Sequence, residues 1–197
     1  QGDVGSGKTI VALCAAFNVV KSGFQVAIMA PTEILARQHF NLAKKIYNKS
    51  INLEILSSKS EYRDKKIISK KLKDNQIDII FGTHAIFQKR IIFYNLGLII
   101  IDEQHKFGVN QRIKLAKKGG KNCDLLLISA TPIPRTMMLS FFGDMDISRL
   151  KEKPKNRHNI LTLVKPESKI SELWPLLKKE MSFERQIFWV CPLIDES

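Results

Sequence analysis

The sequence predicts an α/β fold in which a parallel sheet is covered by helices on both faces. Five runs have the length and β-branched content of strands, and helical patterns lie between them. A glycine-rich loop at residues 2–9 leads directly into an apolar helical pattern, as in a strand–loop–helix unit. Apolar strands that alternate with helices are typical of parallel sheets, and ligands bind beyond the carboxyl ends of such strands.

The predicted strands cover residues 25–30, 51–56, 77–81, 98–101 and 125–129. The run at 51–56 alternates more between apolar and polar residues, so we expect it nearer a sheet edge. Helical patterns cover residues 9–20, 33–47, 61–73 and 110–118. Farther along the chain, a helical pattern at 167–180 contains Pro175, which we expect to kink the helix at a cost of about 3 kcal/mol. A last strand is predicted at 186–190.

The chain of 197 residues carries 32 Lys and Arg against 19 Asp and Glu, a net charge of +13. This charge favours a polyanionic partner, but codon bias in an AT-rich genome produces the same richness in Lys, Ile and Asn. The 44% hydrophobic content excludes a wholly disordered chain. No apolar run approaches the roughly 18 residues of a membrane span, so no membrane association is expected. Cys14, Cys123 and Cys191 lie in apolar stretches, so we expect buried thiols and a reducing, cytoplasmic compartment.

Residues 2–9, GDVGSGKT, match the phosphate-binding pattern G-x-x-x-x-G-K-[ST]. Its glycines let successive backbone N–H groups turn toward phosphate oxygens, and the following helix adds the positive end of its dipole. We expect Lys8 to reach the β- and γ-phosphates of a nucleotide and Thr9 to ligate Mg²⁺. The predicted ATP-binding residues are Gly2, Gly5, Ser6, Gly7, Lys8 and Thr9. Because Gln1 is not Met and no strand precedes the loop, we expect a fragment cut at this point.

Polar residues follow the ends of several predicted strands, and the most informative are Asp102 and Glu103 after a run of Ile. Two adjacent acids there are costly to bury unless they meet a cation. We expect Asp102 to hold Mg²⁺ and Glu103 to orient and deprotonate the attacking water, with Lys8 as the third catalytic residue. The structural alternative is an acid that caps the next helix.

Seven stretches, in this order, resemble motifs of the superfamily-two helicases, and within them of the RecG family of branch-migration helicases. They are GDVGSGKT (2–9), PTEILARQH (31–39), GTHAIFQ (82–88), DEQHKFGVNQR (102–112), SATPIPRTMM (129–138), GDMDIS (143–148) and VCPLIDES (190–197). The transcription-repair translocase Mfd shares TPIPRT but matches PTEILARQH and DEQH less well. The primosomal helicase PriA matches less well still.

The resemblance implies an ATP-dependent DNA helicase that uses ATP and Mg²⁺, remodels branched DNA in repair and recombination, and works as a monomeric motor. The residues that it implies for coupling the nucleotide state to DNA are Gln104, His105, Ser129, Ala130 and Thr131. Those that it implies for contacting the sugar-phosphate of DNA are Thr32, Arg37, Gly82, Thr83 and His84. The basic run over residues 63–73 either extends this surface or is an ordinary solvated helix face.

By the same resemblance, residues 1–148 form a RecA-like P-loop NTPase domain without its first strand, 149–165 a linker, and 166–197 the truncated start of a second RecA-like domain. The second domain of such helicases supplies arginine fingers, whose absence lowers turnover by roughly 10³–10⁵. We therefore expect the fragment to bind Mg-ATP weakly and not to unwind DNA. The alternatives are an Mfd-like double-strand DNA translocase, a degraded non-functional gene product, a nucleotide-dependent binding switch and, with least support, a P-loop kinase.

Overall fold

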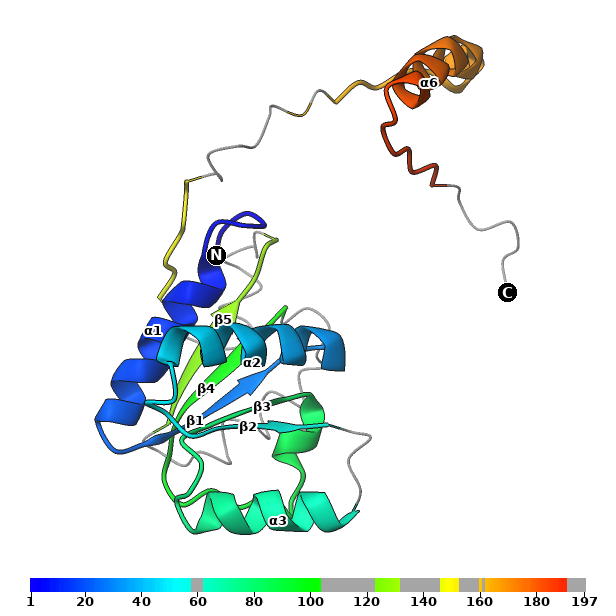
Figure 1. The fold of residues 1–197 in the computed structure, drawn as a ribbon. Coiled ribbons are helices and arrows are strands. Elements are labelled where there is room, and N and C mark those ends of the chain that lie inside the picture. The colour runs from blue at the N-terminus through cyan, green and yellow to red at the C-terminus, as the bar shows by residue number, and fades with distance from the viewer. Residues whose placement is uncertain (58–61, 104–122, 132–145, 153–159, 161, 191–197) are drawn as a thin grey trace. The chain divides into compact units, whose positions relative to one another are not determined.

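The computed structural model describes residues 1–57, 62–103, 123–131, 146–152, 160 and 162–190. The chain divides into two compact units, Gln1–Lys155 and Asn156–Ser197. The first unit is an α/β structure built around a five-stranded sheet (Figure 1). The α/β class with a parallel sheet, predicted from the alternation of strands and helices, is confirmed.

The five strands are β1 (Gln25–Met29), β2 (Leu53–Leu56), β3 (Ile79–Gly82), β4 (Leu96–Asp102) and β5 (Asp124–Ile128). Their order in the sheet is β2-β3-β1-β4-β5, and every neighbouring pair is parallel. All five were predicted, and β2 lies at an edge, as its more alternating pattern indicated.

The helices in the described part of this unit are α1 (Lys8–Lys21), α2 (Glu33–Tyr47), α3 (Tyr62–Lys73) and the short 3₁₀ helix η1 (His84–Phe87). The predicted bounds of α2 are correct, and those of α1 and α3 differ by one residue at most. The helix predicted at 110–118 lies outside the described residues. No helix in the described ranges combines the length and the apolar content needed to cross a bilayer.

The two faces of the sheet pack against different helices. Leu98 and Ile100 of β4 belong to a core cluster shared with α1 and α2. Ile99 and Ile101 belong to a second cluster, which is shared with α3 and η1. Because side chains alternate along a strand, Asp102, two residues beyond Ile100, falls on the face that α1 and α2 cover. The last residue of β4 therefore lies on the face of the sheet that also carries the helix following the glycine-rich loop.

A buried glutamine ties three segments together at the other end of the sheet. Gln25 is 1% exposed. Its Nε2 donates to the carbonyl oxygens of Leu72 (2.9 Å) and Ile77 (2.8 Å). Its Oε1 accepts from the backbone N–H groups of Tyr94 (2.8 Å) and Asn95 (3.2 Å). One amide thereby satisfies four backbone groups from the end of α3, the approach to β3 and the approach to β4.

The helical pattern predicted at 167–180 is divided in the structure. The 3₁₀ helix η4 (Glu167–Glu172) comes first and α6 (Leu173–Ser182) follows. Pro175 is the third residue of α6, in its first turn, where a backbone N–H has no acceptor within the helix. The kink and the cost of about 3 kcal/mol predicted for Pro175 are therefore wrong.

The strand predicted at 186–190 is also wrong, since these residues form no strand in the structure. A strand is stable only with a paired neighbour, and the described part of this unit offers none. Instead Trp189 stacks on Trp174 of α6, with ring centroids 5.4 Å apart and an interplanar angle of 7°. No described side chain between 162 and 190 is buried.

The expectation of buried thiols is wrong for Cys14, which is exposed. It lies on the same outer face of α1 as Ile10 and Val11, which are 44% and 53% exposed. A helix that is apolar nearly all round does not reveal which face meets the sheet. Cys123 is half-buried, and this burial, together with the neighbouring charge of Asp124, raises the pKa of its thiol to about 11. Cys191 lies outside the described residues.

We expect Gln25→Met to lower the free energy of unfolding by about 3 kcal/mol or more. The methionine keeps the shape of the side chain but leaves four backbone groups without partners, at about 1–3 kcal/mol for each group that stays buried. Urea denaturation followed by circular dichroism measures the loss. The control is Gln38→Met on the exposed side of α2, for which a change within about 0.5 kcal/mol is expected. Equal losses of unfolding free energy in the two variants would contradict the role of Gln25 in holding the three segments together.

Candidate functional site

The glycine-rich loop has the backbone conformation that its glycines permit. Gly5 and Gly7 have φ values of +82° and +90°, in the left-handed region. Gly7 is the N-cap of α1. A Cβ atom on Gly2 would lie 2.6 Å from Ser6 Oγ and 3.0 Å from the backbone oxygen of Leu150, so the loop has no room for a side chain at this position. The glycines serve conformation at two positions and close packing at a third.

Lys8 is held by the loop itself. Its Nζ donates to the carbonyl oxygens of Gly2 and Asp3, both at 2.8 Å. An ammonium group has three N–H donors, so these two contacts leave one for an anion. The first turn of α1 contains no acidic residue, and the positive end of the helix dipole is therefore not neutralised from within the helix. This is the arrangement that a phosphate requires.

Ser6 provides an independent observation on the same loop. Its Oγ atom is buried and has no hydrogen-bond partner among the described residues. A buried hydroxyl without a partner costs roughly 1–3 kcal/mol. A phosphate oxygen bound in the loop would accept this hydrogen bond, so the unpaired hydroxyl fits an anion site.

Backbone pairing connects the loop to the acidic residues at the end of β4. Gly2 N donates to Ser129 O at 3.3 Å, and Ser129 directly follows β5. Strand β5 pairs in parallel with β4, so that Ile128 lies opposite Asp102. Lys8, which donates to the carbonyl of Gly2, and Asp102 therefore lie at the same edge of the sheet. Ser129, the first residue after β5, lies between them.

The two acids differ in their surroundings. Asp102 is 9% exposed, and its Oδ2 lies 2.8 Å from Nε2 of His39 in α2. Glu103 has a left-handed backbone, with φ at +50°, and its N–H donates to Ile128 O at 3.0 Å. A side chain in this region costs about 1–2 kcal/mol, and such strain is concentrated at functional sites. The chain therefore turns sharply directly after Asp102, at the end of β4.

The residues predicted to hold Mg²⁺ supply suitable donors. Thr9, the second residue of α1, offers a hydroxyl, and Asp102 offers a carboxylate on the face that α1 covers. Mg²⁺ prefers such oxygen ligands and binds through one or two protein groups, with water and phosphate completing its shell. The chemistry of this donor set fits the ion.

The residues predicted for coupling form a hydrogen-bonded turn next to the loop. Ser129 is 2% exposed, and its Oγ accepts from Thr131 N at 3.2 Å and donates to Thr131 O at 2.9 Å. Ala130 lies between them. The carbonyl of Ser129 also accepts from Gly2 N, so one hydrogen bond joins the loop to this turn. Gln104 and His105 lie outside the described residues.

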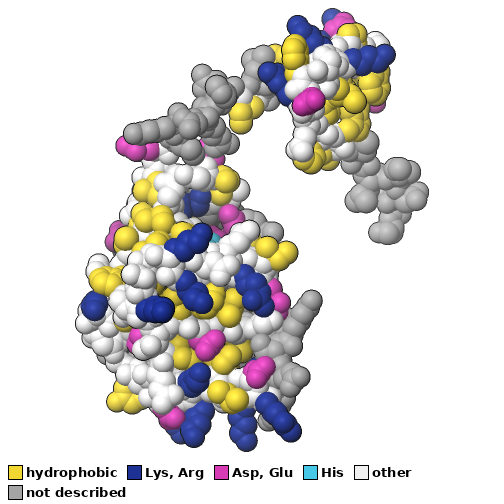
Figure 2. Space-filling view, viewed as in Figure 1, with side chains coloured by type: hydrophobic (Ala, Val, Ile, Leu, Met, Phe, Trp, Pro, Cys, Tyr) yellow, Lys and Arg dark blue, Asp and Glu magenta, His cyan; other side chains and the backbone are white. Residues whose placement is uncertain are grey.

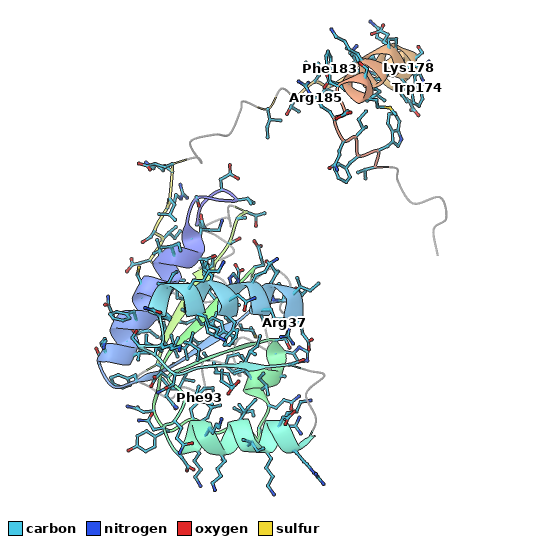
Figure 3. The ribbon with its side chains drawn as sticks, in the orientation of Figure 1. Arg37, Phe93, Trp174, Lys178, Phe183 and Arg185 are labelled. Atoms are coloured by element: carbon cyan, nitrogen blue, oxygen red, sulfur yellow. The ribbon has the colours of Figure 1, made fainter. Side chains whose placement is uncertain are left out.

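The residues predicted to contact DNA fall into two groups. At the start of α2, Thr32 is exposed, and its Oγ1 accepts from Leu35 N at 3.3 Å as the helix N-cap. Arg37 is exposed on the next turn of the same helix (Figure 3). Thr32 therefore has a structural role in addition to the predicted one, whereas the guanidinium of Arg37 is accessible to a phosphate.

The second group, Gly82, Thr83 and His84, follows β3. A Cβ on Gly82 would lie 2.6 Å from Leu56 O of the neighbouring strand, so close packing of the sheet explains this glycine. Thr83 is 6% exposed, and its Oγ1 has no partner among the described residues. His84 is exposed. Of these three residues, His84 alone presents a side chain to solvent.

The basic run of residues 63–73 lies on α3, and Figure 2 shows Lys and Arg side chains gathered over this helix. Helix α3 packs on the face of the sheet opposite to that of Asp102. This position favours the interpretation of the run as a solvated helix face.

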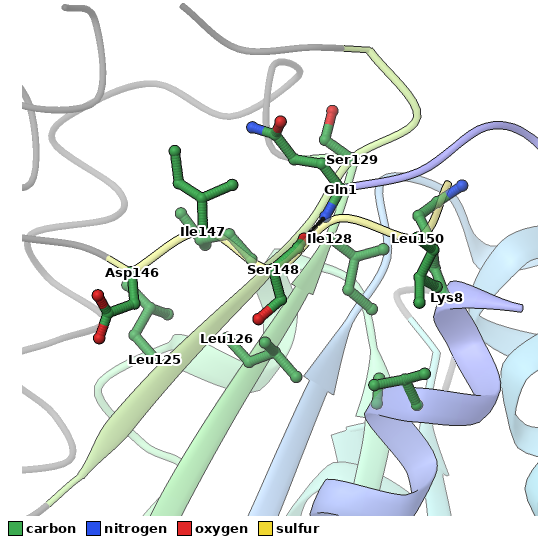
Figure 4. Close-up of a pocket in the computed structure, with 13 residues that line it drawn as sticks. Gln1, Lys8, Leu125, Leu126, Ile128, Ser129, Asp146, Ile147, Ser148 and Leu150 are labelled. Atoms are coloured by element: carbon green, nitrogen blue, oxygen red, sulfur yellow. Dashed lines mark hydrogen bonds between the residues drawn. The ribbon is translucent and has the colours of Figure 1, made fainter. Parts of the chain in front are cut away.

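A cavity of about 160 Å³ lies beside Lys8, between α1, β5 and residues 146–150 (Figure 4). Gln1 crosses its upper end, where its backbone nitrogen donates to Ser148 O at 2.7 Å. Most of the lining side chains are Leu, Ile, Val or Ala. An apolar lining does not suit a triphosphate, so we assign the anion to the loop and not to this cavity.

His39 is a candidate that the motif analysis missed, because it stands in the stretch PTEILARQH without a role. The buried residues of α2 are Ala36, His39, Ala43 and Tyr47, which form one stripe along the helix. The sequence shows that a histidine interrupts a stripe of small and aromatic residues. It does not show that this histidine contacts Asp102, which is 63 residues away.

Comparisons with known proteins place these residues in context. Residues 1–139 match the DEAD/DEAH box helicase family. The chain is 44% identical over 198 residues to the ATP-dependent DNA helicase RecG of Thermotoga maritima and 45% identical over 199 residues to RecG of Aquifex aeolicus. It is 42% identical over 197 residues to RecG of Staphylococcus aureus. The whole chain is matched in each case, and it spans 25–29% of the length of these relatives.

Solved structures give the same result. A structure of RecG bound to a three-way DNA junction matches 98% of this chain and 26% of its own, with a TM-score of 0.77 and 41% identity. A structure of Dbp5 from S. cerevisiae matches 76% of this chain and 40% of its own, with a TM-score of 0.58 and 19% identity, which is evidence for the fold alone. The RecA-like fold and the resemblance to RecG, both predicted from the motifs, are confirmed.

We expect Gly7→Ala to weaken binding of a nucleoside triphosphate by roughly tenfold. An L-residue at φ +90° costs about 1–2 kcal/mol, which the loop relieves by leaving the conformation that binds phosphate. Isothermal titration calorimetry measures the affinity. The control is Gly23→Ala, because Gly23 has a φ of +86° and equally open surroundings but lies beyond the far end of α1. We expect both variants to lose a similar amount of stability, but only Gly7→Ala to lose affinity for the nucleotide. Equal affinities in the two variants would contradict the assignment of the loop as the phosphate site.

Proposed function

Because the chain belongs to the DEAD/DEAH box helicase family, we propose that it is the ATP-binding part of a RecG-type, ATP-dependent DNA helicase. The observation that carries the proposal is the position of Lys8 and Asp102 at one edge of the sheet, connected through Gly2 and Ser129. A motor of this kind requires a phosphate-binding loop and a metal-binding acid within reach of one triphosphate.

In the proposed reaction the loop binds the β- and γ-phosphates of ATP. Backbone N–H groups around Gly5 and Gly7 face the phosphate oxygens, and Ser6 Oγ, which has no partner among the described residues, donates a hydrogen bond to them. Lys8 uses its third N–H on the γ-phosphate while keeping its contacts to the loop carbonyls. The positive end of α1 stabilises the negative charge that develops on the phosphoryl oxygens.

Hydrolysis is assigned to the acids. Thr9 and Asp102 would hold Mg²⁺, which when bound withdraws charge from the phosphates. Glu103 orients a water molecule toward the γ-phosphorus and accepts its proton as the oxygen–phosphorus bond forms, and ADP departs. The left-handed backbone of Glu103 supports a functional role at this position, because backbone strain is concentrated at functional sites.

DNA remodelling is proposed from the relatives. RecG has been solved bound to a three-way DNA junction, which supports branched DNA as the substrate and roles in branch migration and repair. Arg37, His84 and Thr32 are proposed to contact the sugar-phosphate backbone, with Gly82 and Thr83 supporting them from within. The turn Ser129–Ala130–Thr131 would transmit the nucleotide state, and we propose that the motor acts as a monomer.

We further propose that the 197 residues by themselves bind ATP but do not unwind DNA. The chain spans 25–29% of the length of the relatives that carry the helicase name. Rapid DNA-stimulated hydrolysis by the isolated chain would refute this proposal.

Glu103→Gln is expected to lower the rate of phosphate release by roughly 10²–10⁴, since the amide cannot accept the proton of the attacking water. The dissociation constant for ATP should stay within about twofold of the original value. Single-turnover phosphate release and fluorescence titration with a methylanthraniloyl ATP analogue measure the two quantities. Glu54→Gln on the edge strand β2, which loses an ion pair with Lys71, is the control and should leave both unchanged. An unaltered rate in Glu103→Gln would exclude it as the base.

Arg37→Ala is expected to weaken binding to a labelled three-way junction and to reduce the slope of log affinity against log salt by about 1, because one phosphate contact is lost. Fluorescence anisotropy at several salt concentrations measures this slope. The matched control is Lys21→Ala, since Lys21 ends α1 at the opposite edge of the sheet. Equal effects of the two substitutions would indicate nonspecific charge instead of a DNA contact at Arg37.

A further inference from the structure

His39 is the polar member of the buried stripe of α2. It is 8% exposed, whereas the neighbouring buried positions hold Ala36 and Ala43. The apolar cluster on this face includes Ala43 and the central strands. A polar ring in such surroundings requires a partner, and its partner identifies what the ring does.

That partner is the carboxylate of Asp102. Nε2 of His39 lies 2.8 Å from Oδ2 of Asp102, and the two side chains are 10% and 12% exposed. A carboxylate that is ionised only accepts hydrogen bonds, and Nε2 is then the donor of this contact. The contact joins the second turn of α2 to the last residue of β4. Among the described residues, no other side chain bonds to this carboxylate.

The contact determines how the carboxylate can bind a cation. The imidazole takes one lone-pair site of Oδ2, and the other sites of the carboxylate, both on Oδ1 among them, stay open to a metal or to a water in its shell. The plane of the carboxylate is also restrained, because α2 packs on the sheet and His39 is itself buried, at 8% exposure. Outer hydrogen-bond partners of this kind orient metal ligands, and their loss typically lowers metal affinity by about 10–100-fold.

We propose that His39 is a positioning residue that orients the Asp102 carboxylate for Mg²⁺ bound with ATP. The inference rests on the proposed function and extends it to a residue outside the loop and the acidic pair. His39 acts through Asp102 and touches neither the nucleotide nor the attacking water.

The test compares His39→Met with His39→Gln in the full chain. Methionine and glutamine have similar length, but only glutamine can donate an N–H to Asp102. Affinity for the methylanthraniloyl ATP analogue is measured with Mg²⁺ and with EDTA, and the ratio of the two affinities reports the contribution of the metal. Mn²⁺ bound together with a non-hydrolysable ATP analogue, measured by electron paramagnetic resonance, reports the metal directly. Tyr47→Phe is the control, because it removes the hydrogen bond from Tyr47 to Leu13 O on the same stripe of α2 without reaching Asp102.

We expect His39→Met to lower the Mg²⁺-to-EDTA ratio and the Mn²⁺ affinity by about tenfold or more, with the EDTA affinity unchanged. His39→Gln should return both to within about threefold of the original values, and Tyr47→Phe should leave both unaltered. An unchanged ratio in His39→Met overturns the proposal. Equal losses in His39→Met and His39→Gln, or a parallel loss of the EDTA affinity, also overturn it and indicate a purely structural histidine. A wild-type chain that binds no nucleotide overturns the proposed function itself, and with it this role.

Discussion

The parallel register of β4 and β5 is the constraint on which the candidate site depends. It sets Asp102 opposite Ile128, and Ser129 then meets Gly2 at the start of the glycine-rich loop. A shift of one residue would turn Asp102 toward the α3 face and separate it from Lys8, because strand side chains alternate. Register in a sheet covered on both faces is set by its apolar side chains. Packing of the core therefore determines the chemistry at the edge.

Few polar side chains are buried in the described part of this unit, and most of them connect one element to another. Gln25 connects three backbone segments at one end of the sheet. Tyr47 OH donates to Leu13 O at 2.6 Å and so connects α2 to α1. Burial raises the pKa of the Tyr47 phenol above its ordinary value, so this donor stays protonated. The pair of His39 and Asp102 belongs to the same class of contact but lies at the edge where ligands bind. Ser6 Oγ and Thr83 Oγ1 differ in lacking a partner among the described residues.

The surface proposed to contact DNA is narrower than the net charge of +13 indicates. The basic residues of α3 lie on the face opposite to Asp102, and Gly82 is required by the approach of Leu56 O. The side chains that combine exposure with a position in the predicted motifs are Thr32, Arg37 and His84. A motor that contacts every nucleotide alike needs few such groups, provided that they follow the backbone of the strand.

The sequence by itself determined the class of fold, the strands and helices of the first unit, the glycine-rich loop and the family, because periodicity and short motifs are local properties of the chain. It did not determine that Cys14 faces solvent, since α1 is apolar on all sides. Pro175 was misjudged because its effect depends on where the helix begins, and residues 186–190 because strands form only with partners. The contact of His39 with Asp102 joins residues 63 positions apart. Only the packing of α2 on the sheet decided it, because no local pattern records which buried side chains meet.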